Sequence, residues 1–120
     1  MSTSFEGDRE LARDQIAAII EAEIIANPAL AQQYDGLLRR CLVRPAVVGC
    51  QQHSDPSAAG LIPLWLVFEE PPARGDRYFI VYDPNRSGFG IGVWEGQRAW
   101  FVEGCGRFFE MLERLSAERH

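Results

Sequence analysis

The residues of this chain that could perform covalent chemistry are one cysteine, one histidine and one aspartate. Cys105 lies in the stretch EGCGRFFEML, immediately ahead of a predicted helix. A helix N-terminus lowers the pKa of a thiol and makes the thiol more nucleophilic. His53 is the only internal histidine and shares a loop with Asp55. No spacing links the three residues, so we expect a thiol packed in a strand-to-helix turn and a solvated histidine.

The carboxylates and glycine-rich stretches do not match the spacing of a catalytic or metal site. Glu69 and Glu70 are adjacent on an apolar strand, so they point to opposite faces and cannot act as a pair. We expect one of them to be solvated and the other to lie at the rim of the sheet. The segment 83–88, DPNRSG, has too few carboxylates for calcium, and 88–92, GFGIG, is not followed by a phosphate-binding helix. We therefore predict no catalytic residue, no cofactor and no metal.

Composition limits the class of protein further. A chain of 120 residues predicts a single domain over 1–120, in which we expect 1–7 to form a disordered tail. A net charge of −5 argues against a nucleic-acid partner, and all twelve cations are arginine, which excludes a lysine nucleophile. The three cysteines, Cys41, Cys50 and Cys105, show no CxxC spacing for zinc or for a disulfide framework. The polar N-terminus and the absence of an apolar run of about 20 residues predict a cytoplasmic protein without a membrane partner.

Hydrophobic periodicity predicts helices at both ends of the chain. Isoleucines at helical spacing predict a helix over 8–26, with a core face of Ile16, Ile19, Ile20 and Ile24. Asn27 and Pro28 are typical of an N-cap and a first helical position, so a second helix should begin there and end before Arg44-Pro45. A last amphipathic helix is indicated by Phe108, Met111, Leu112 and Leu115.

The middle of the chain predicts a sheet. Apolar and β-branched runs indicate strands at 61–70, 77–83, 89–94 and 97–103, separated by Pro- and Gly-rich turns. We expect the glycines of Gly104-Cys105-Gly106 to end the sheet. The predicted fold class is α+β: two N-terminal helices, an antiparallel β-meander of about four strands and a C-terminal amphipathic helix.

Residues 89–101, FGIGVWEGQRAWF, place glycines inside a strand. A two-residue turn at Glu95-Gly96 would put Gly92 opposite Ala99 and Gly90 opposite Phe101. One face would then form a core of Phe89, Ile91, Val93, Trp100 and Val102. The other face would be a shallow trough of Gly90, Gly92 and Ala99 between Trp94 and Phe101.

Two interpretations of this trough remain open. In one, an aromatic ring of the protein or the C-terminal helix covers the glycines. In the other, the trough meets a protein partner, because aromatic residues concentrate binding energy at interfaces. The partner-binding residues would then be Trp94, Phe101, Gly90, Gly92 and Glu95.

Several short motifs resemble the SUKH superfamily of immunity and cell-wall-regulator domains. The resemblance lies in PALAQQYDGLLRR at 28–40, LIP at 61–63, GDRYF at 75–79, the pair Val93-Trp94, and GRFFEML at 106–112. It implies a non-enzymatic domain, since many such bacterial proteins are thought to neutralise a cognate toxin, often a nuclease, by direct binding. An acidic protein would suit a basic nuclease, because complementary charge speeds encounter and sets specificity.

Three functions therefore compete. The first is an immunity-type protein that binds another protein through its sheet face. The second is a small acidic secretion-type chaperone acting as a dimer, which should expose apolar residues on a helix, with Phe109 as the candidate. The third is a thiol-dependent enzyme using Cys105. We favour the first.

Overall fold

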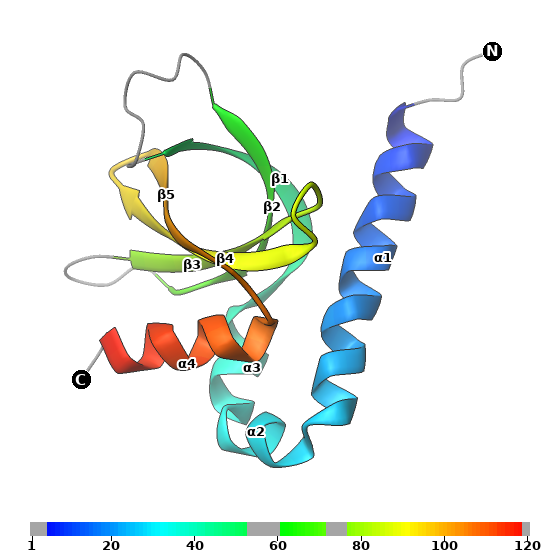
Figure 1. Ribbon diagram of the computed structural model, residues 1–120, viewed down its shortest axis with the longest axis vertical. Coiled ribbons are helices and arrows are strands. Elements are labelled where there is room, and N and C mark those ends of the chain that lie inside the picture. Colours follow the sequence, from blue (N-terminus) through cyan, green and yellow to red (C-terminus); the bar gives the residue numbers. More distant parts are fainter. Residues whose placement is uncertain (1–4, 53–60, 72–76, 119–120) are drawn as a thin grey trace.

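The computed structural model describes residues 5–52, 61–71 and 77–118, in which a small β-barrel packs against helices (Figure 1). The helices are α1 (Phe5–Ala26), α2 (Pro28–Gln33), α3 (Asp35–Cys41) and α4 (Phe108–Glu118). The strands are β1 (Leu42–Gln52), β2 (Ile62–Glu69), β3 (Arg77–Asp83), β4 (Gly88–Glu95) and β5 (Arg98–Gly106). The predicted α+β class is confirmed. No helix in the described ranges combines the length and the apolar character that crossing a membrane requires.

Helix α1 begins earlier than predicted and buries only part of the predicted face. It starts at Phe5, while residues 1–4 of the expected tail lie outside the described residues. Ile16 and Ile20 are buried in the core and Ile24 packs against it. The prediction for Ile19 is wrong, because this side chain is 40% exposed.

The second predicted helix is shorter and divided. Pro28 opens α2 as predicted, but the Asn27 side chain donates to the Glu23 carbonyl oxygen at 2.8 Å instead of capping α2. Helices α2 and α3 meet at Tyr34, and β1 begins at Leu42, so a helix up to residue 44 is wrong. Proline disfavours helix at the preceding residue, and pairing with β2 stabilises the extended chain beyond that point.

The predicted open meander of about four strands is a closed barrel of five. Consecutive strands pair antiparallel from β1 to β5, as a meander requires. Parallel pairs between β1 and β5, beginning with Cys50↔Ala99, close the ring. Strand β1 was missed because Arg44-Pro45 and the polar pair Gln51-Gln52 flank a short apolar run.

Closure gives the sheet two buried faces. Inside the barrel lies a cluster of Cys50, Leu64, Phe79, Val81 and Ala99. On the outside, Phe68, Ile80 and Phe89 pack with helix residues such as Ile20, Phe108 and Leu112. This double burial explains why residues 61–70 are almost continuously apolar instead of alternating.

Strand β5 runs through the glycines that were expected to end the sheet. It continues to Gly106, and Gly90 pairs with Gly104 while Phe89 pairs with Gly106. The register shifts twice along this pairing, and Gly104 has φ +137°, a conformation that L side chains rarely adopt. Glycines and bulges of this kind bend strands strongly enough to close a small barrel.

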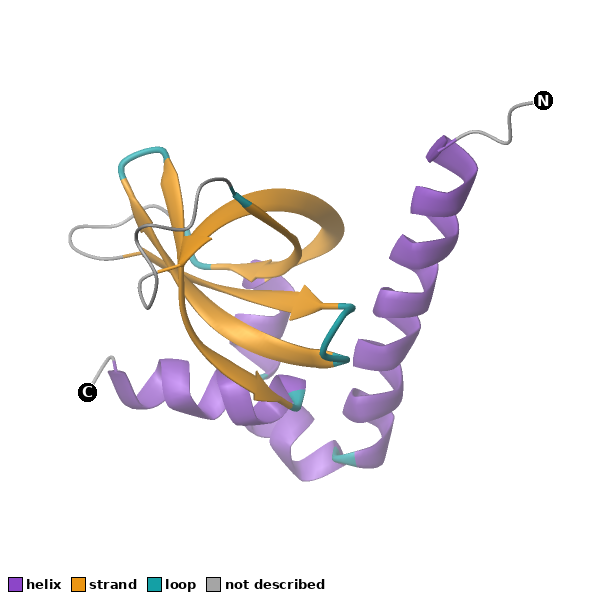
Figure 2. Ribbon diagram, turned by 45° about the horizontal axis from the view of Figure 1, so that its top comes forward, coloured by secondary structure: helices purple, strands orange, loops and turns teal. Residues whose placement is uncertain are grey.

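Helices α1 and α4 pack against the outside of the barrel in different orientations. Figures 1 and 2 show α1 standing along the barrel and α4 lying below it, so that the two converge near the C-terminal half of α1. The predicted amphipathic character of α4 is confirmed, since Phe108, Met111, Leu112 and Leu115 are buried. One side of α1 therefore meets the core, and its opposite side does not.

Candidate functional site

The five residues predicted to bind a partner do come together on β4 and β5. Gly92 pairs with Phe101, Trp94 with Ala99 and Glu95 with Arg98. The predicted register is wrong by two residues because the turn is Gly96-Gln97, with Gly96 at φ +61°. A slip of two residues keeps every side chain on its face, since the side-chain period of a strand is two. The residues that were predicted to share a face therefore share it despite the error in register.

The opposite face of the hairpin is only partly the predicted core. Phe89 and Ile91 are buried as expected, and Val93 and Trp100 are half-buried. Val102 is 45% exposed, so its assignment to the core is wrong. It lies where β5 has an extra residue between the pairs Ile91↔Glu103 and Gly92↔Phe101, and such a bulge turns a side chain out of the ladder.

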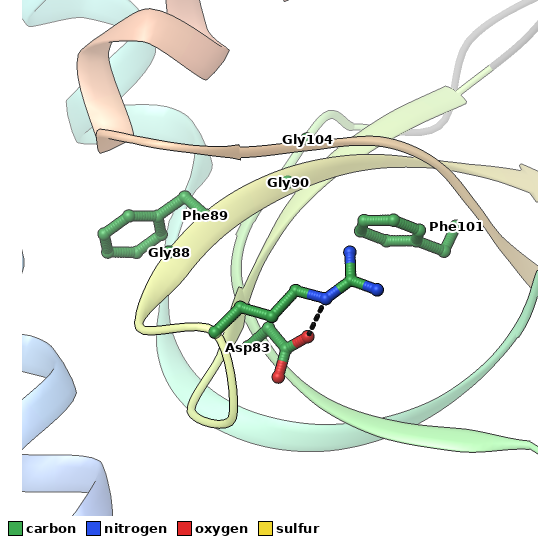
Figure 3. A pocket seen from close by; sticks show the side chains of 7 residues that line it. Asp83, Gly88, Phe89, Gly90, Phe101 and Gly104 are labelled. Atoms are coloured by element: carbon green, nitrogen blue, oxygen red, sulfur yellow. Dashed lines mark ion pairs between the residues drawn. The ribbon is translucent and has the colours of Figure 1, made fainter.

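The glycine trough faces the interior of the barrel and is filled by the protein's own rings. A Cβ placed on Gly90 would collide with the ring of Phe101, and one placed on Gly92 would collide with the ring of Phe79. Figure 3 shows Gly90 and Gly104 on neighbouring strands beside Phe101. The hollow at this point measures about 10 Å³, which is room for one water molecule at most. Both glycines are buried, so the first of the two interpretations holds for them: aromatic rings of the protein itself cover the glycines.

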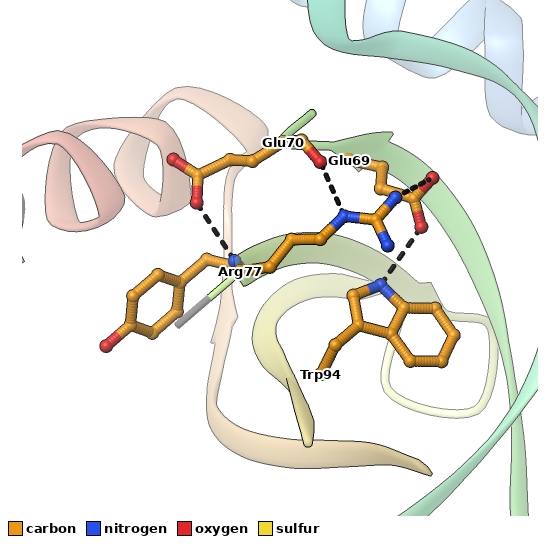
Figure 4. A network of polar contacts seen from close by, with 5 residues as sticks. Glu69, Glu70, Arg77 and Trp94 are labelled. Carbon is orange, nitrogen blue, oxygen red and sulfur yellow. Dashed lines mark hydrogen bonds and ion pairs between the residues drawn. The ribbon is translucent and has the colours of Figure 1, made fainter. Parts of the chain in front are cut away.

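Trp94 is held by a polar network at one end of the barrel (Figure 4). Its Nε1 donates to Glu69 Oε2 at 3.0 Å, and Glu69 Oε1 lies 3.0 Å from a guanidinium nitrogen of Arg77. The same guanidinium lies 5.9 Å from the centre of the indole ring, and the ring of Phe79 is tilted against Trp94 with the ring centres 5.2 Å apart. Trp94 is half-buried and already satisfied by its own chain. Of the five predicted residues, only Glu95 is exposed.

The two adjacent glutamates diverge, as predicted. Figure 4 shows their carboxylates pointing away from one another. Glu70 is buried and accepts a hydrogen bond from the backbone N–H of Tyr78 at 2.9 Å, while its carbonyl accepts one from Arg77 Nε at 2.8 Å. Because Glu69 is also bonded, the expectation that one of the pair would be solvated is wrong.

The described residues offer little for covalent chemistry. His53, Asp55 and the side chain of Cys105 lie outside the described part of the chain. Burial raises the pKa of the Cys50 thiol to about 11 and also raises the pKa of Cys41, where the positive charge of Arg40 opposes the effect. Both remain neutral thiols near pH 7. Within the described ranges, no three His, Cys, Asp or Glu residues gather as a metal site would require.

A larger hollow lies between the C-terminal half of α1 and the barrel, and we call it the α1 groove. It is open to solvent and has a volume of about 570 Å³. Its apolar lining consists of Ile19, Ala22 and Ala26 from α1 and Tyr82, Phe89 and Gly106 from the sheet. The rings of Tyr82 and Phe89 lie 4.9 Å apart at its floor, and Glu23 and Arg107 are among its polar members.

The groove continues into an exposed apolar face of α1, which we call the α1 stripe. It is formed by Leu11, Ala18, Ala22 and Ile25, which recur at intervals of seven and four or three residues and therefore share one side of the helix. Leu11 is 59% exposed and Ile25 is 71% exposed. Patches of exposed apolar side chains mark interaction sites on soluble proteins. The stripe and the groove are the candidate site.

Two polar contacts hold α1 in the position that creates the groove. Glu23 accepts hydrogen bonds from the backbone N–H groups of Phe108 and Phe109, at 2.9 and 3.3 Å, so its carboxylate caps the N-terminus of α4. Arg13 Nε donates to the carbonyl of Pro45 at 2.8 Å. These contacts determine which side of α1 faces the core, and the α1 stripe therefore faces the solvent.

Sequence reasoning missed this site, although a signal was present. Apolar residues occupy nearly the whole circumference of α1 between residues 11 and 26, and a helix that covers a core with one side needs them on that side only. The apolar residues beyond that side were the signal, and they are Ala18, Ala22, Ile25 and Ala26.

Comparisons with known proteins do not assign the site. No family model, no curated protein and no solved structure matches the chain.

Proposed function

We propose that this chain is a non-enzymatic protein-binding domain whose binding surface is the α1 stripe together with the α1 groove. One observation carries the proposal: the exposed Ile19 lines a largely apolar hollow of about 570 Å³, and Leu11 and Ile25 are exposed on the same helix. Burying a leucine or isoleucine side chain contributes about 1.5–3 kcal/mol. Association with a partner would therefore gain free energy that the isolated chain does not use.

An immunity-type role suits these properties. The chain has a net charge of −5, and its short motifs resemble the SUKH superfamily, many members of which are thought to neutralise a toxin by direct binding. The proposal moves the contact from the glycine trough to α1. Trp94, Phe101 and Glu95 could still contribute at the barrel end, since none of them is fully buried.

A photo-crosslinking amino acid placed at Ala22 tests the binding surface. Position 22 faces the groove, whereas position 117 is exposed on α4 and serves as the control. In cells that produce the protein, we expect one partner to be crosslinked from position 22 and not from position 117. The partner is then purified, and its affinity for the wild type and for Ile25→Glu is measured. Equal crosslinking from both positions, or an unchanged affinity in Ile25→Glu, would refute the proposed surface.

Neutralisation is tested by growth. The chain is co-expressed with the product of any adjacent toxin reading frame, and growth with the wild type is compared with growth in the presence of Ile25→Glu. We expect the wild type to protect and the variant to protect less. Protection that is independent of the stripe would retain the immunity role and reject its placement on α1.

A chaperone role is the second candidate, and the same exposed helix favours it. Phe109, the residue expected to be exposed, is only 3% exposed. Exposed apolar residues lie on α1 instead. A chaperone of this kind acts as a dimer, so sedimentation of the purified chain separates the two roles: a monomer supports the immunity-type role.

A further inference from the structure

The chemistry beside the α1 stripe defines the partner more narrowly, and this inference rests on the proposed function. Glu10, Asp14 and Glu21 are exposed and follow one another at intervals of four and seven residues. This spacing places them along one edge of the stripe, and we call them the acidic row. Beyond the exposed Gln15, the opposite edge of the stripe is apolar, since Ile19 and Ala26 lead from it into the α1 groove.

Among the described side chains of α1, no basic group neutralises this row. The helix contains six acidic and two basic residues. One of the two, Arg13, donates to Pro45 on the barrel side, at 2.8 Å. No ion pair among the described residues involves the acidic row. The stripe is therefore apolar in the middle, negatively charged along one edge and concave along the other.

A second copy of this chain does not suit such a surface. In an antiparallel pair of helices, equivalent edges face each other, so Asp14 of one copy would approach Glu21 of the other. Like charges in that position are destabilising. In a parallel pair, the acidic row would instead lie against the apolar edge formed by Ile19 and Ala26, and its carboxylates would lose water without gaining a partner.

We propose that the α1 stripe binds an amphipathic helix of a protein partner, with arginine or lysine residues along the edge that meets the acidic row. The apolar face of this helix would lie over Ala18, Ala22 and Ile25, and one side of it would enter the groove toward Phe89. The small alanines in the middle of the stripe permit close approach of two helix axes. Recognition of an amphipathic helix by an apolar groove is a recurrent binding mode, and complementary charge selects among such helices.

Two synthetic 22-residue helices provide the test. Both carry leucine and alanine at the positions of a heptad seam; one carries arginine along a single edge, and the other carries glutamate at the same positions. Binding of each fluorescent peptide to the full chain is followed by anisotropy. We expect the arginine helix to bind at least tenfold more tightly, with a preference that shrinks as the salt concentration rises.

Three variants locate the interaction. Ile25→Glu should abolish binding of the arginine helix, whereas Ala117→Glu, which adds the same charge at an exposed position on α4, should leave it nearly unchanged. The double variant Asp14→Arg/Glu21→Arg should reverse the preference and bind the glutamate helix more tightly. Circular dichroism of each variant confirms that α1 and the barrel are retained.

The outcomes separate the inference from the proposed function. Equal affinity for both helices, or a preference that the double variant does not reverse, would overturn the basic partner while leaving the helix-binding surface in place. If neither helix binds, or if Ile25→Glu and Ala117→Glu weaken binding equally, both the inference and the proposed surface fail. A dimer of the chain alone that Ile25→Glu converts to a monomer would make a second copy the occupant and would also overturn the inference.

Discussion

The β4–β5 hairpin and helix α1 both carry more apolar surface than their own element can cover, and the fold treats them in opposite ways. The hairpin faces the barrel interior with its glycines, and there the rings of Phe79 and Phe101 fill the space above Gly92 and Gly90. Helix α1 turns Ile16 and Ile20 to the core and leaves Leu11 and Ile25 in solvent. Apolar residues in a sequence thus indicate a need for burial, and only the fold decides whether the chain itself provides it.

The largest expected effect tests the barrel side of this comparison. Phe79 is fully buried and its ring lies over Gly92 and against Trp94. Phe79→Ala should lower the free energy of unfolding by about 3–5 kcal/mol, since it leaves a cavity in the core. Phe101→Ala should cost less because Phe101 is half-exposed. Urea unfolding of both variants measures the difference, and a Phe79→Ala protein of unchanged stability would show that the barrel interior is not a packed core.

A substitution in the trough itself should also destabilise. Gly92→Val forces two methyl groups into the ring of Phe79 and toward the carbonyl of Trp100, and we expect a loss of about 1–3 kcal/mol. The control is Gly36→Ala in α3, where the only nearby atom is a terminal nitrogen of Arg40 at 4.0 Å. That change should be neutral or stabilising by up to about 1 kcal/mol. Thermal unfolding distinguishes the two, and a tolerated valine at position 92 would mean that the trough is open.

The junction between the two regions depends on Glu23. Glu23→Ala removes the carboxylate that caps α4 and should cost about 1–2 kcal/mol. Glu21→Ala, two residues earlier on an exposed side of α1, is the matched control and should change stability by less than about 0.5 kcal/mol. Equal effects in urea unfolding would show that the cap does not hold α1 against α4.

Alkaline pH gives a smaller effect that also reports on the sealed barrel. Cys50 has its pKa raised from 9.0 to about 11 by burial, so the folded state keeps the thiol neutral while the unfolded state ionises. Its contribution to stability is complete below about pH 9 and is lost as the pH rises toward 11, with a size on the order of 1 kcal/mol. Between these pH values, the wild type should lose stability more steeply than Cys50→Ala. Parallel curves would mean that water reaches the thiol.

The smallest effect is expected on the stripe. Ile25 is 71% exposed, so Ile25→Ala should change the free energy of unfolding by less than about 0.5 kcal/mol, although Ile25→Glu is expected to abolish helix binding. A stability loss as large as that of a core isoleucine would place this side chain in an internal contact and remove it from the binding surface.

The sequence by itself determined the elements and much of their grouping. Periodicity located α1, β3, β4 and α4 to within a few residues, and a period of two kept Gly90, Gly92, Trp94 and Phe101 on one face despite the error in register. These properties follow from local geometry: the repeat of a helix or strand fixes which side chains share a side, and proline and glycine mark where an element begins or turns.

Tertiary structure alone decided which side of each element is covered. The pairing of Cys50 with Ala99 closes the barrel across about fifty residues of chain and converts a predicted surface trough into an interior. The carboxylate of Glu23 reaches backbone N–H groups 85 and 86 residues away and sets α1 so that Ile25 stays outside. Such long-range contacts depend on the free energy of the whole fold, and local patterns carry no information about which of several apolar faces will find a partner.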